Sequence, residues 1–338
     1  MFEIATYADQ SVNKLNQRVN KIVQKQTLNL TFVKCCVCES SDATLIGQGE
    51  DFEYHTSPDT SLAMRCNSCG LVYLNPRPAI SVLEQIYPPT YHAYNFSEKN
   101  FGFVYKIRSK LEARRLLNRC HNLPDDARIL DIGCGDGFHL NLLRKFGKKT
   151  WSLEGIDVDK HAVEAATRSG LKVHLGTAEE IDLPNENYDL VFMIMTIEHV
   201  EKPDAVLRVV HKLLKRGGRL VIVTDNTNSV DFKFFKNRHW GGYHFPRHWN
   251  LFNYQSISKL AEKTGFEIER LATIVSPVNW VYSIHNTLVD WKKPNWLINL
   301  FTLKSTVSLM VFTALDFVLQ KFGKGAVLQV TLRKPCKK

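Results

Sequence analysis

The sequence predicts an α/β fold: a doubly wound, parallel sheet of seven strands, preceded by a small cysteine-rich module. Three observations support this prediction. Apolar, strand-like runs alternate with segments of helical periodicity from Ile129 to Gly218, which is typical of a parallel sheet covered on both faces. The first of these runs ends in a glycine-rich loop. Two pairs of closely spaced cysteines lie upstream of it.

The composition is that of a folded protein. Of the 338 residues, 44% are hydrophobic and 23% are charged, so a sizeable core is expected and a disordered chain is excluded. The formal net charge of +10 favours an anionic partner, such as nucleic acid, an anionic membrane surface or a phosphate-bearing substrate. Solvated basic faces explain the same charge equally well.

The N-terminal segment, residues 1–34, is polar, and Val12, Leu15, Val19 and Val23 recur at helical spacing. We therefore expect a helical extension here rather than a signal peptide. A reducing, cytoplasmic location follows, and the eight cysteines are then thiols or metal ligands rather than disulfides.

Residues 35–80 carry two Cys-x-x-Cys pairs, formed by Cys35 with Cys38 and by Cys66 with Cys69. Each pair supplies two thiolates on one tight turn, and two pairs complete a closed tetrahedral site, so we expect a zinc-ribbon module with structural Zn²⁺. Cys36 is a spare that could replace Cys35. The alternative is four reduced cysteines without a metal.

The glycine-rich loop follows the first strand of the sheet. Asp131 closes the strand, and Gly133, Gly135 and Gly137 come at alternate positions before a helical segment, with Cys134 among them. Glycine permits positive φ and lets the backbone approach a ligand closely, and a helix N-terminus favours a negatively charged group. A plain strand-to-helix turn would show the same pattern.

Three further features extend this loop into a motif set. A second strand ends at Asp157, which is placed to accept hydrogen bonds from a ribose diol. A third strand leads into Gly176-Thr-Ala-Glu179, and Tyr188–Met195 forms a fourth. With the Gly-x-Gly-x-Gly loop and its preceding acid, this set resembles the class I S-adenosylmethionine-dependent methyltransferases, which have a Rossmann-like sheet.

The resemblance implies a cofactor site. Asp131, Gly133, Gly135 and Gly137 are expected to line the methionine part of S-adenosylmethionine, with Cys134 in the same loop as a small loop residue rather than a nucleophile. Asp157 is expected at the ribose hydroxyls, and Ala178 and Glu179 at the adenine edge.

The methyltransferase domain is expected to span residues 98–338. It begins with an amphipathic helix over residues 98–120 that packs against the sheet. Later strands are predicted at Arg219–Asp225, Phe266–Ile274 and Ala326–Arg333.

An apolar helical insertion is expected at about residues 280–322. Its most apolar stretch is too short to span a membrane, because a membrane span takes about 20 residues. The insertion is expected to cap the substrate pocket, to contact a membrane peripherally or to form a dimer interface.

The acceptor side is expected at the carboxyl ends of strands four and five, where open α/β sheets bind ligands. His199 follows Glu198 after strand four, and His244 and His248 lie in an aromatic loop after strand five. With an unperturbed pKa near ~6.5, these histidines are candidates for a general base. Hydrogen-bonded scaffolding is the alternative.

The acceptor segments resemble two features of quinone-pathway methyltransferases. The loop from His239 to Asn250 is similar to their His-containing substrate segment. Some of these O-methyltransferases bind a divalent metal through a Glu-x-x-Glu-His set, but Met195 stands here where the first Glu is expected.

The leading functional hypothesis is therefore O- or C-methylation of a glycan, isoprenoid or lipid-linked intermediate. An RNA methyltransferase whose zinc ribbon grips nucleic acid is the first alternative. A non-catalytic module that keeps the cofactor fold is the second. The Asn/Asp-Pro-Pro-aromatic run of many nucleobase-methylating enzymes is missing after strand four, which makes nucleic acid the less favoured partner.

Overall fold

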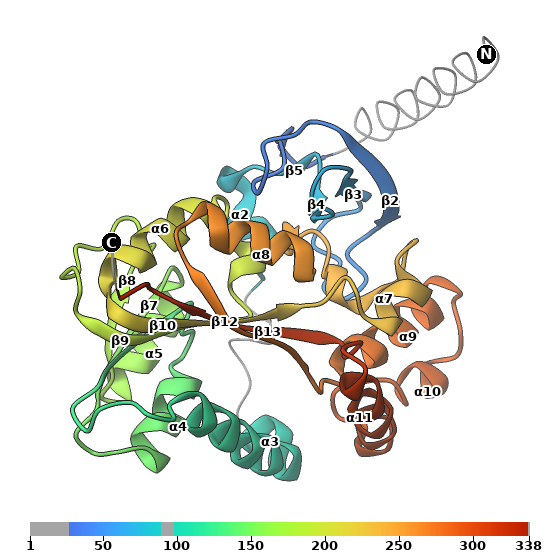
Figure 1. The fold of residues 1–338 in the computed structure, drawn as a ribbon. Coiled ribbons are helices and arrows are strands. Elements are labelled where there is room, and N and C mark those ends of the chain that lie inside the picture. The colour runs from blue at the N-terminus through green and yellow to red at the C-terminus, as the bar shows by residue number, and fades with distance from the viewer. Residues whose placement is uncertain (1–26, 89–97, 337–338) are drawn as a thin grey trace.

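The computed structural model of the chain describes residues 27–88 and 98–336. At its centre is a seven-stranded sheet with the strand order β12-β13-β10-β9-β6-β7-β8 (Figure 1). Its strands are, in chain order, β6 (Arg128–Ile132), β7 (Ser152–Asp157), β8 (Lys172–Leu175), β9 (Tyr188–Ile194), β10 (Leu214–Asp225), β12 (Glu267–Ile274) and β13 (Val327–Arg333). Strands β6 to β10 run parallel to one another, whereas β13 is antiparallel to both β10 and β12. The predicted seven-stranded α/β sheet is confirmed.

Helices cover both faces of this sheet (Figure 1). The helices α3 (Glu98–Arg119), α4 (Phe138–Phe146) and α5 (Lys160–Arg168) lie on one face, and α6 (Pro203–Leu213) and α8 (Tyr254–Lys263) on the other. On α6, for example, Val206, Leu207 and Val210 form a buried apolar stripe at helical spacing. The order of the strands reverses between β6 and β9, and such a switch point is where open α/β sheets form a ligand crevice at the carboxyl ends of the strands.

The cysteine-rich module is built on a second sheet, with the order β11-β4-β3-β2. Three strands come from the module itself, namely β2 (Ala43–Gly49), β3 (Ser61–Cys66) and β4 (Val72–Leu74). The fourth, β11 (Asn250–Leu251), belongs to the loop after β10 and pairs with β4. Buried Cys69 and Leu71 also belong to the same hydrophobic cluster as the sheet residue Leu130. The module and the central sheet therefore share one core.

Short elements flank this module. The strand β1 (Leu30–Thr31) pairs with β5 (Arg77–Pro78), and η1 (Ile80–Val82) and α2 (Leu83–Ile86) follow. Residues 1–26 of the expected helical extension lie outside the described part of the chain. At its described end, the extension is a short strand instead of a helix, because the backbone of Leu30 and Thr31 pairs with the edge of β5.

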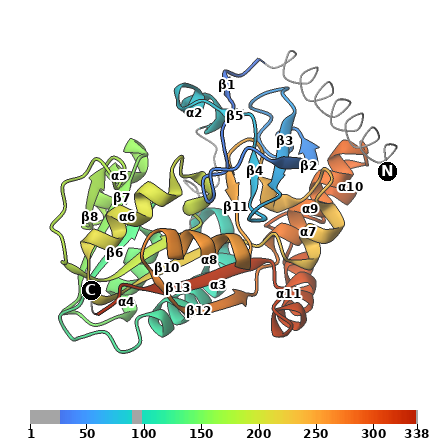
Figure 2. The ribbon, with the colours of Figure 1, turned by 45° about the horizontal axis from the view of Figure 1, so that its top comes forward.

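The apolar insertion forms three helices at the β12 end of the sheet: α9 (Val278–Asp290), α10 (Asn295–Ile298) and α11 (Thr306–Lys321) (Figure 2). They lie beside α7 (Val230–Phe235), and the short turns η3 (Ile197–His199) and η4 (Gly241–Tyr243) follow β9 and α7. Among the described residues, no helix combines the length and the hydrophobicity that are needed to cross a membrane.

Candidate active site

The glycine loop connects the carboxyl end of β6 to the N-terminus of α4. Gly133 and Gly135 both have positive φ, at 74° and 54°, which is a conformation that favours glycine. A Cβ on Gly133 would come within 2.4 Å of the Thr196 hydroxyl oxygen, so only glycine fits beside the segment that follows β9. A Cβ on Gly135 would meet no atom within 4 Å. The backbone at Gly135 thus borders open space where a ligand can approach.

Asp131 is the second-last residue of β6, directly before this loop, and is 1% exposed. Neither of its side-chain oxygens has a hydrogen-bond partner among the described residues, and Nδ1 of His139 lies 3.8 Å from Oδ2. Burial, together with the Asp157 carboxylate, raises the pKa of Asp131 to about 8. A buried carboxylate without a partner requires a compensating donor, and a cationic ammonium group would meet that need. The position therefore fits the methionine part of the expected cofactor.

Asp157 ends β7 next to the glycine loop. Its Oδ2 accepts a hydrogen bond from the backbone N–H of Gly135 at 2.7 Å, and its Oδ1 accepts one from the N–H of Asp159 at 2.9 Å. Burial raises the pKa of this carboxyl group above its usual value. The carboxylate is thus held at the edge of the loop, where a ribose diol can donate to it.

The other residues expected at the cofactor differ in exposure. Ala178 is buried and Glu179 is exposed, and both lie in the turn after β8. Cys134 is buried, and its burial, with the Asp131 and Asp157 carboxylates nearby, raises the pKa of the thiol. Because only a thiolate is nucleophilic, these surroundings favour a small loop residue over a nucleophile.

The acceptor side is built on the ends of β9 and β10. Glu198 lies in η3, is fully buried, and accepts a hydrogen bond from the Thr224 hydroxyl of β10 at 2.8 Å. Burial raises the pKa of Glu198 to about 7. Asp225 ends β10, is 1% exposed, and accepts a hydrogen bond from the Asn279 amide of α9 at 2.7 Å. Two buried carboxyl groups therefore lie at the carboxyl ends of β9 and β10.

His248 lies against both carboxyl groups. Its Nδ1 donates to the backbone carbonyl of Gly242 at 2.9 Å and lies 3.2 Å from Oδ2 of Asp225. Burial alone would lower the pKa of His248, but the carboxylates of Asp225 and Glu198 outweigh it and raise the pKa above the usual value. Because Nδ1 carries the proton of the neutral ring, Nε2 is the nitrogen that can accept a second one.

The other two predicted histidines surround His248. The ring centroid of His199 lies 4.6 Å from that of His248, and the centroid of His244 lies 4.9 Å from it. Burial and the neighbouring His248 lower the pKa of both His199 and His244. The His199 Nδ1 lies 2.8 Å from the hydroxyl of Tyr87. The structure thus brings all three candidate histidines into one cluster.

Two acids from the cysteine-rich module reach this cluster. Glu53 Oε2 lies 2.9 Å from Nδ1 of His244, and both side chains are less than one-tenth exposed. The carboxylate of Asp51 forms a paired contact with the guanidinium of Arg247, at 2.7 Å and 3.2 Å. Burial alone would raise the pKa of Asp51, but the hydrogen bond and the charge of Arg247 lower this pKa to about 2. Arg247 is fully buried and also donates to the backbone carbonyl of Ile86 at 2.6 Å.

Glu198, His199 and His248 each present one ligand atom, and these atoms all lie within 4.8 Å of one another. This grouping has the chemistry of a divalent-cation site as well as that of a proton relay. Met195 stands where the resembling metal set has its first Glu. Its side chain is 39% exposed and carries a thioether in place of a carboxylate, so it adds no oxygen ligand to this group.

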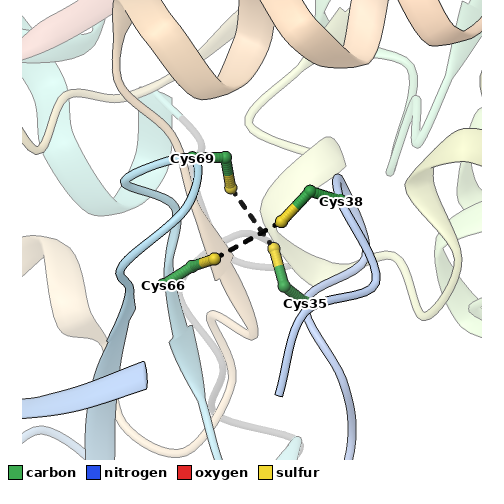
Figure 3. Close-up of side chains that lie close together, drawn as sticks. All are labelled: Cys35, Cys38, Cys66 and Cys69. Carbon is green, nitrogen blue, oxygen red and sulfur yellow. Dashed lines mark hydrogen bonds between the residues drawn. The ribbon is translucent and has the colours of Figure 1, made fainter. Parts of the chain in front are cut away.

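The four cysteines of the two Cys-x-x-Cys pairs converge (Figure 3). The Sγ atoms of Cys35 and Cys69 are 3.4 Å apart, those of Cys38 and Cys66 are 3.4 Å apart, and all four lie within 4.8 Å of one another. A tetrahedral zinc site with Zn–S bonds of about 2.3 Å needs sulfur atoms at about this spacing. Cys36 points elsewhere, since its thiol donates to the side-chain oxygen of Asn250 at 3.3 Å. The cluster thus fits a zinc ribbon.

Sequence reasoning missed several residues of the acceptor side: Asp51, Glu53, Tyr87, Asp225, Arg247 and Asn279. Asp225 could have been found, because it closes strand five at the edge where ligands bind. The acids of the module could not, because nearly 200 positions separate Glu53 from His244 and Asp51 from Arg247.

Comparisons with known proteins agree with this geometry. Residues 105–271 match a family of methyltransferase domains. The ubiquinone biosynthesis O-methyltransferase of Cereibacter sphaeroides is 29% identical over 169 residues, which cover 46% of this chain and 67% of that protein. The enzyme of the same name from Bradyrhizobium diazoefficiens is 34% identical over 120 residues, covering 34% and 46% of the two chains.

A solved structure shares the fold. The phosphoethanolamine N-methyltransferase 2 of Haemonchus contortus, in complex with S-adenosylmethionine, aligns with a TM-score of 0.50 at 18% identity. The alignment covers 87% of this chain and 68% of that one.

Proposed function

Because the chain belongs to the class I S-adenosylmethionine-dependent methyltransferases, we propose that it methylates a hydroxyl oxygen of a small isoprenoid, glycan or lipid-linked acceptor, with His248 as the general base. S-adenosylmethionine supplies an activated methyl group on a positively charged sulfur. The protein therefore has to place the acceptor oxygen behind the methyl carbon and take up its proton.

The observation that carries this proposal is the buried pair of His248 and Asp225. The Gly242 carbonyl and the Asp225 carboxylate both face Nδ1, so the ring is held in one orientation with Nε2 as the acceptor of the substrate proton. The nearby carboxylates stabilise the imidazolium that forms after proton transfer. The lowered pKa values of His199 and His244 favour the neutral forms of these two rings, so they add no positive charge beside the base.

On the cofactor side, we assign the methionine part to Asp131 and the glycine loop, the ribose hydroxyls to Asp157, and the adenine edge to Ala178 and Glu179. The buried and unpartnered carboxylate of Asp131 supports the first assignment. We further assign structural Zn²⁺ to Cys35, Cys38, Cys66 and Cys69. A site of four thiolates has no open position, so this ion would take no part in the transfer.

The choice of an oxygen acceptor is supported by the relatives, whose names describe O-methylation in ubiquinone biosynthesis. For Glu198, His199 and His248 we assign proton transfer rather than cation binding, because Met195 replaces the first carboxylate of the resembling metal set. RNA is the less favoured acceptor, because two basic side chains at the border of the module, Arg77 of β5 and Lys263 of α8, are paired within the protein. Arg77 contacts Glu201 at 3.1 Å, and Lys263 contacts Glu39 at 3.1 Å.

The test is transfer of a labelled methyl group from S-adenosylmethionine to fractionated lipid, glycan and RNA extracts. We expect label in a lipid or glycan fraction, and label in RNA alone would refute the proposed acceptor class. With the labelled fraction as substrate, His248→Asn should lower kcat by about 10²- to 10⁴-fold, because a general base is lost while an amide still donates to Gly242.

Two controls accompany this variant. Calorimetric affinity for S-adenosylmethionine should stay within about threefold, since His248 lies outside the cofactor loop. His285→Asn removes a histidine of α9 whose Nδ1 is bound to the Phe301 carbonyl at 3.0 Å, and it should leave kcat nearly unchanged. An unchanged kcat in His248→Asn would remove His248 from the role of base.

A further inference from the structure

The helix α11 has an inverted polarity. Only two of its side chains, Ser308 and Asp316, are buried, and both are polar. Its large apolar side chains are exposed instead: Val307 at 68%, Met310 at 61%, Val311 at 56%, Phe317 at 53% and Val318 at 52%. A helix in contact with water normally shows the opposite pattern, so this one is suited to an apolar environment on its outer side.

The buried polar side chains of α11 fix this orientation. The carboxylate of Asp316 accepts hydrogen bonds from the backbone N–H of Ser276 at 2.8 Å and of Ala326 at 3.0 Å. Phe312 stacks on Trp280 of α9, with ring centroids 5.8 Å apart and an interplanar angle of 7°. These contacts hold the helix in place, so its apolar residues cannot turn inward without breaking them.

The neighbouring segments carry aromatic and basic side chains. Trp291, which directly follows α9, is 62% exposed, and Trp296 of α10 is 68% exposed. Five exposed lysines surround the same helices: Lys292, Lys293, Lys304, Lys321 and Lys324. Asp316 is the only acidic residue between positions 291 and 325, and it is fully buried. The exposed charge of this segment is thus entirely positive.

We propose that this α10–α11 face, formed by the exposed apolar side chains of α11, the two tryptophans and the five lysines, docks onto an anionic lipid bilayer. Apolar side chains would enter the boundary between headgroups and acyl chains, tryptophan would lie at that boundary, and lysine would contact the anionic headgroups. A second copy of the chain would also cover apolar residues. It would, however, bring a second set of five lysines to the contact, which like-charge repulsion disfavours.

The face is linked to the acceptor side through α9. The same helix that stacks on α11 holds Asp225 through Asn279, and its Ser283 hydroxyl accepts a hydrogen bond from the backbone N–H of Gly241. Docking would therefore place a bilayer one helix away from the histidine cluster. This placement suits an acceptor that is itself dissolved in or anchored to lipid, but the docking does not depend on the proposed reaction.

The test is sedimentation of the full chain with vesicles, one set of phosphatidylcholine alone and one with phosphatidylglycerol added. We expect binding to the anionic vesicles at least about tenfold tighter than to the neutral ones, and weaker binding at high salt. Lys292→Glu combined with Lys293→Glu should weaken anionic binding by about tenfold or more. Lys149→Glu with Lys160→Glu, at the β6–β8 end of the sheet, is the matched control and should change it little.

A second variant tests the apolar contribution. Val311→Gln combined with Val318→Gln places helix-forming polar residues one heptad apart on the exposed face, so the fold should persist, and vesicle binding should fall by about tenfold or more. Equal binding to both vesicle types, or to neither, would overturn the proposal. A dimer in light scattering that this variant dissolves would overturn it too, by identifying a second copy as the occupant. Methyl-transfer activity is not needed for any of these readings.

Discussion

The cofactor half and the acceptor half of the candidate site are built in opposite ways. Every residue assigned to the cofactor half lies between Asp131 and Glu179, in three consecutive strand-to-loop turns. The acceptor half draws on the cysteine-rich module, the ends of β9 and β10, the loop from His239 to Asn250, and α9. Local backbone geometry shapes the first half, whereas packing between distant segments shapes the second. Perturbations far from the chemistry should therefore damage the acceptor half and spare the cofactor half.

Loss of zinc should separate the two halves most sharply. The strand β11 begins two residues after His248 and pairs with β4, which begins three residues after Cys69. Since zinc binding is coupled to folding of its ligand loops, Cys66→Ser should abolish zinc content and lower methyl transfer by about 100-fold or more. Affinity for S-adenosylmethionine should stay within about threefold. Metal analysis, label transfer and calorimetry measure the three quantities.

Cys36→Ser is the matched control for this variant. Cys36 lies beside the cluster but outside it, and a serine hydroxyl can still donate to Asn250. It should keep its zinc and its activity. If Cys66→Ser lost cofactor affinity in parallel with activity, the two halves would not be independent.

Breaking the buried ion pair between Arg247 and Asp51 should have the next largest effect, a loss of unfolding free energy. Arg247→Met would leave the Asp51 carboxylate buried without its partner, which typically costs about 3–5 kcal/mol of unfolding free energy. Arg238→Met removes two partly exposed ion pairs, one with Glu50 and one with Asp290, and should cost less than about 1 kcal/mol for each pair. Urea unfolding followed by circular dichroism measures both. Similar losses in the two variants would mean that the buried pair does not hold the module to the histidine loop.

Asp157→Asn should affect the cofactor half and lower the affinity for S-adenosylmethionine. Replacing this carboxylate weakens charge-assisted hydrogen bonds worth about 1.5–3 kcal/mol, so affinity for S-adenosylmethionine should fall by about 10- to 100-fold. At saturating cofactor, kcat should stay within about threefold. Asp159→Asn, two residues on, keeps the helix cap that Asp159 provides to Ala162 and should leave the affinity unchanged. A large fall in kcat at saturation would show that Asp157 also positions the acceptor.

The same contrast explains what the sequence could predict. The seven strands and the residues of the glycine loop could be located, because apolar periodicity and glycine spacing record local backbone geometry. The convergence of the four cysteines follows equally from a short spacing rule. No sequence pattern indicates the contacts of Glu53 with His244 and of Asp51 with Arg247, because these contacts form only when two distant segments share a core. The inverted polarity of α11 was also hidden, since an apolar helix does not show in sequence which of its faces is covered.

The pH dependence gives the smallest and most specific effect, because it depends on the protonation of one ring. The carboxylates of Asp225 and Glu198 raise the pKa of His248 above its usual value. A base works only when neutral, so kcat/KM should be constant above that pKa and fall about tenfold per pH unit below it. Asp225→Asn removes a carboxylate that favours the imidazolium, so the acid limb should move to lower pH even though kcat falls with the poorer orientation. Asp231→Asn, which replaces a buried carboxyl group bonded to Trp240, is the control and should leave the limb in place. An acid limb that stays where it is in Asp225→Asn would assign the titrating base to another member of the histidine cluster.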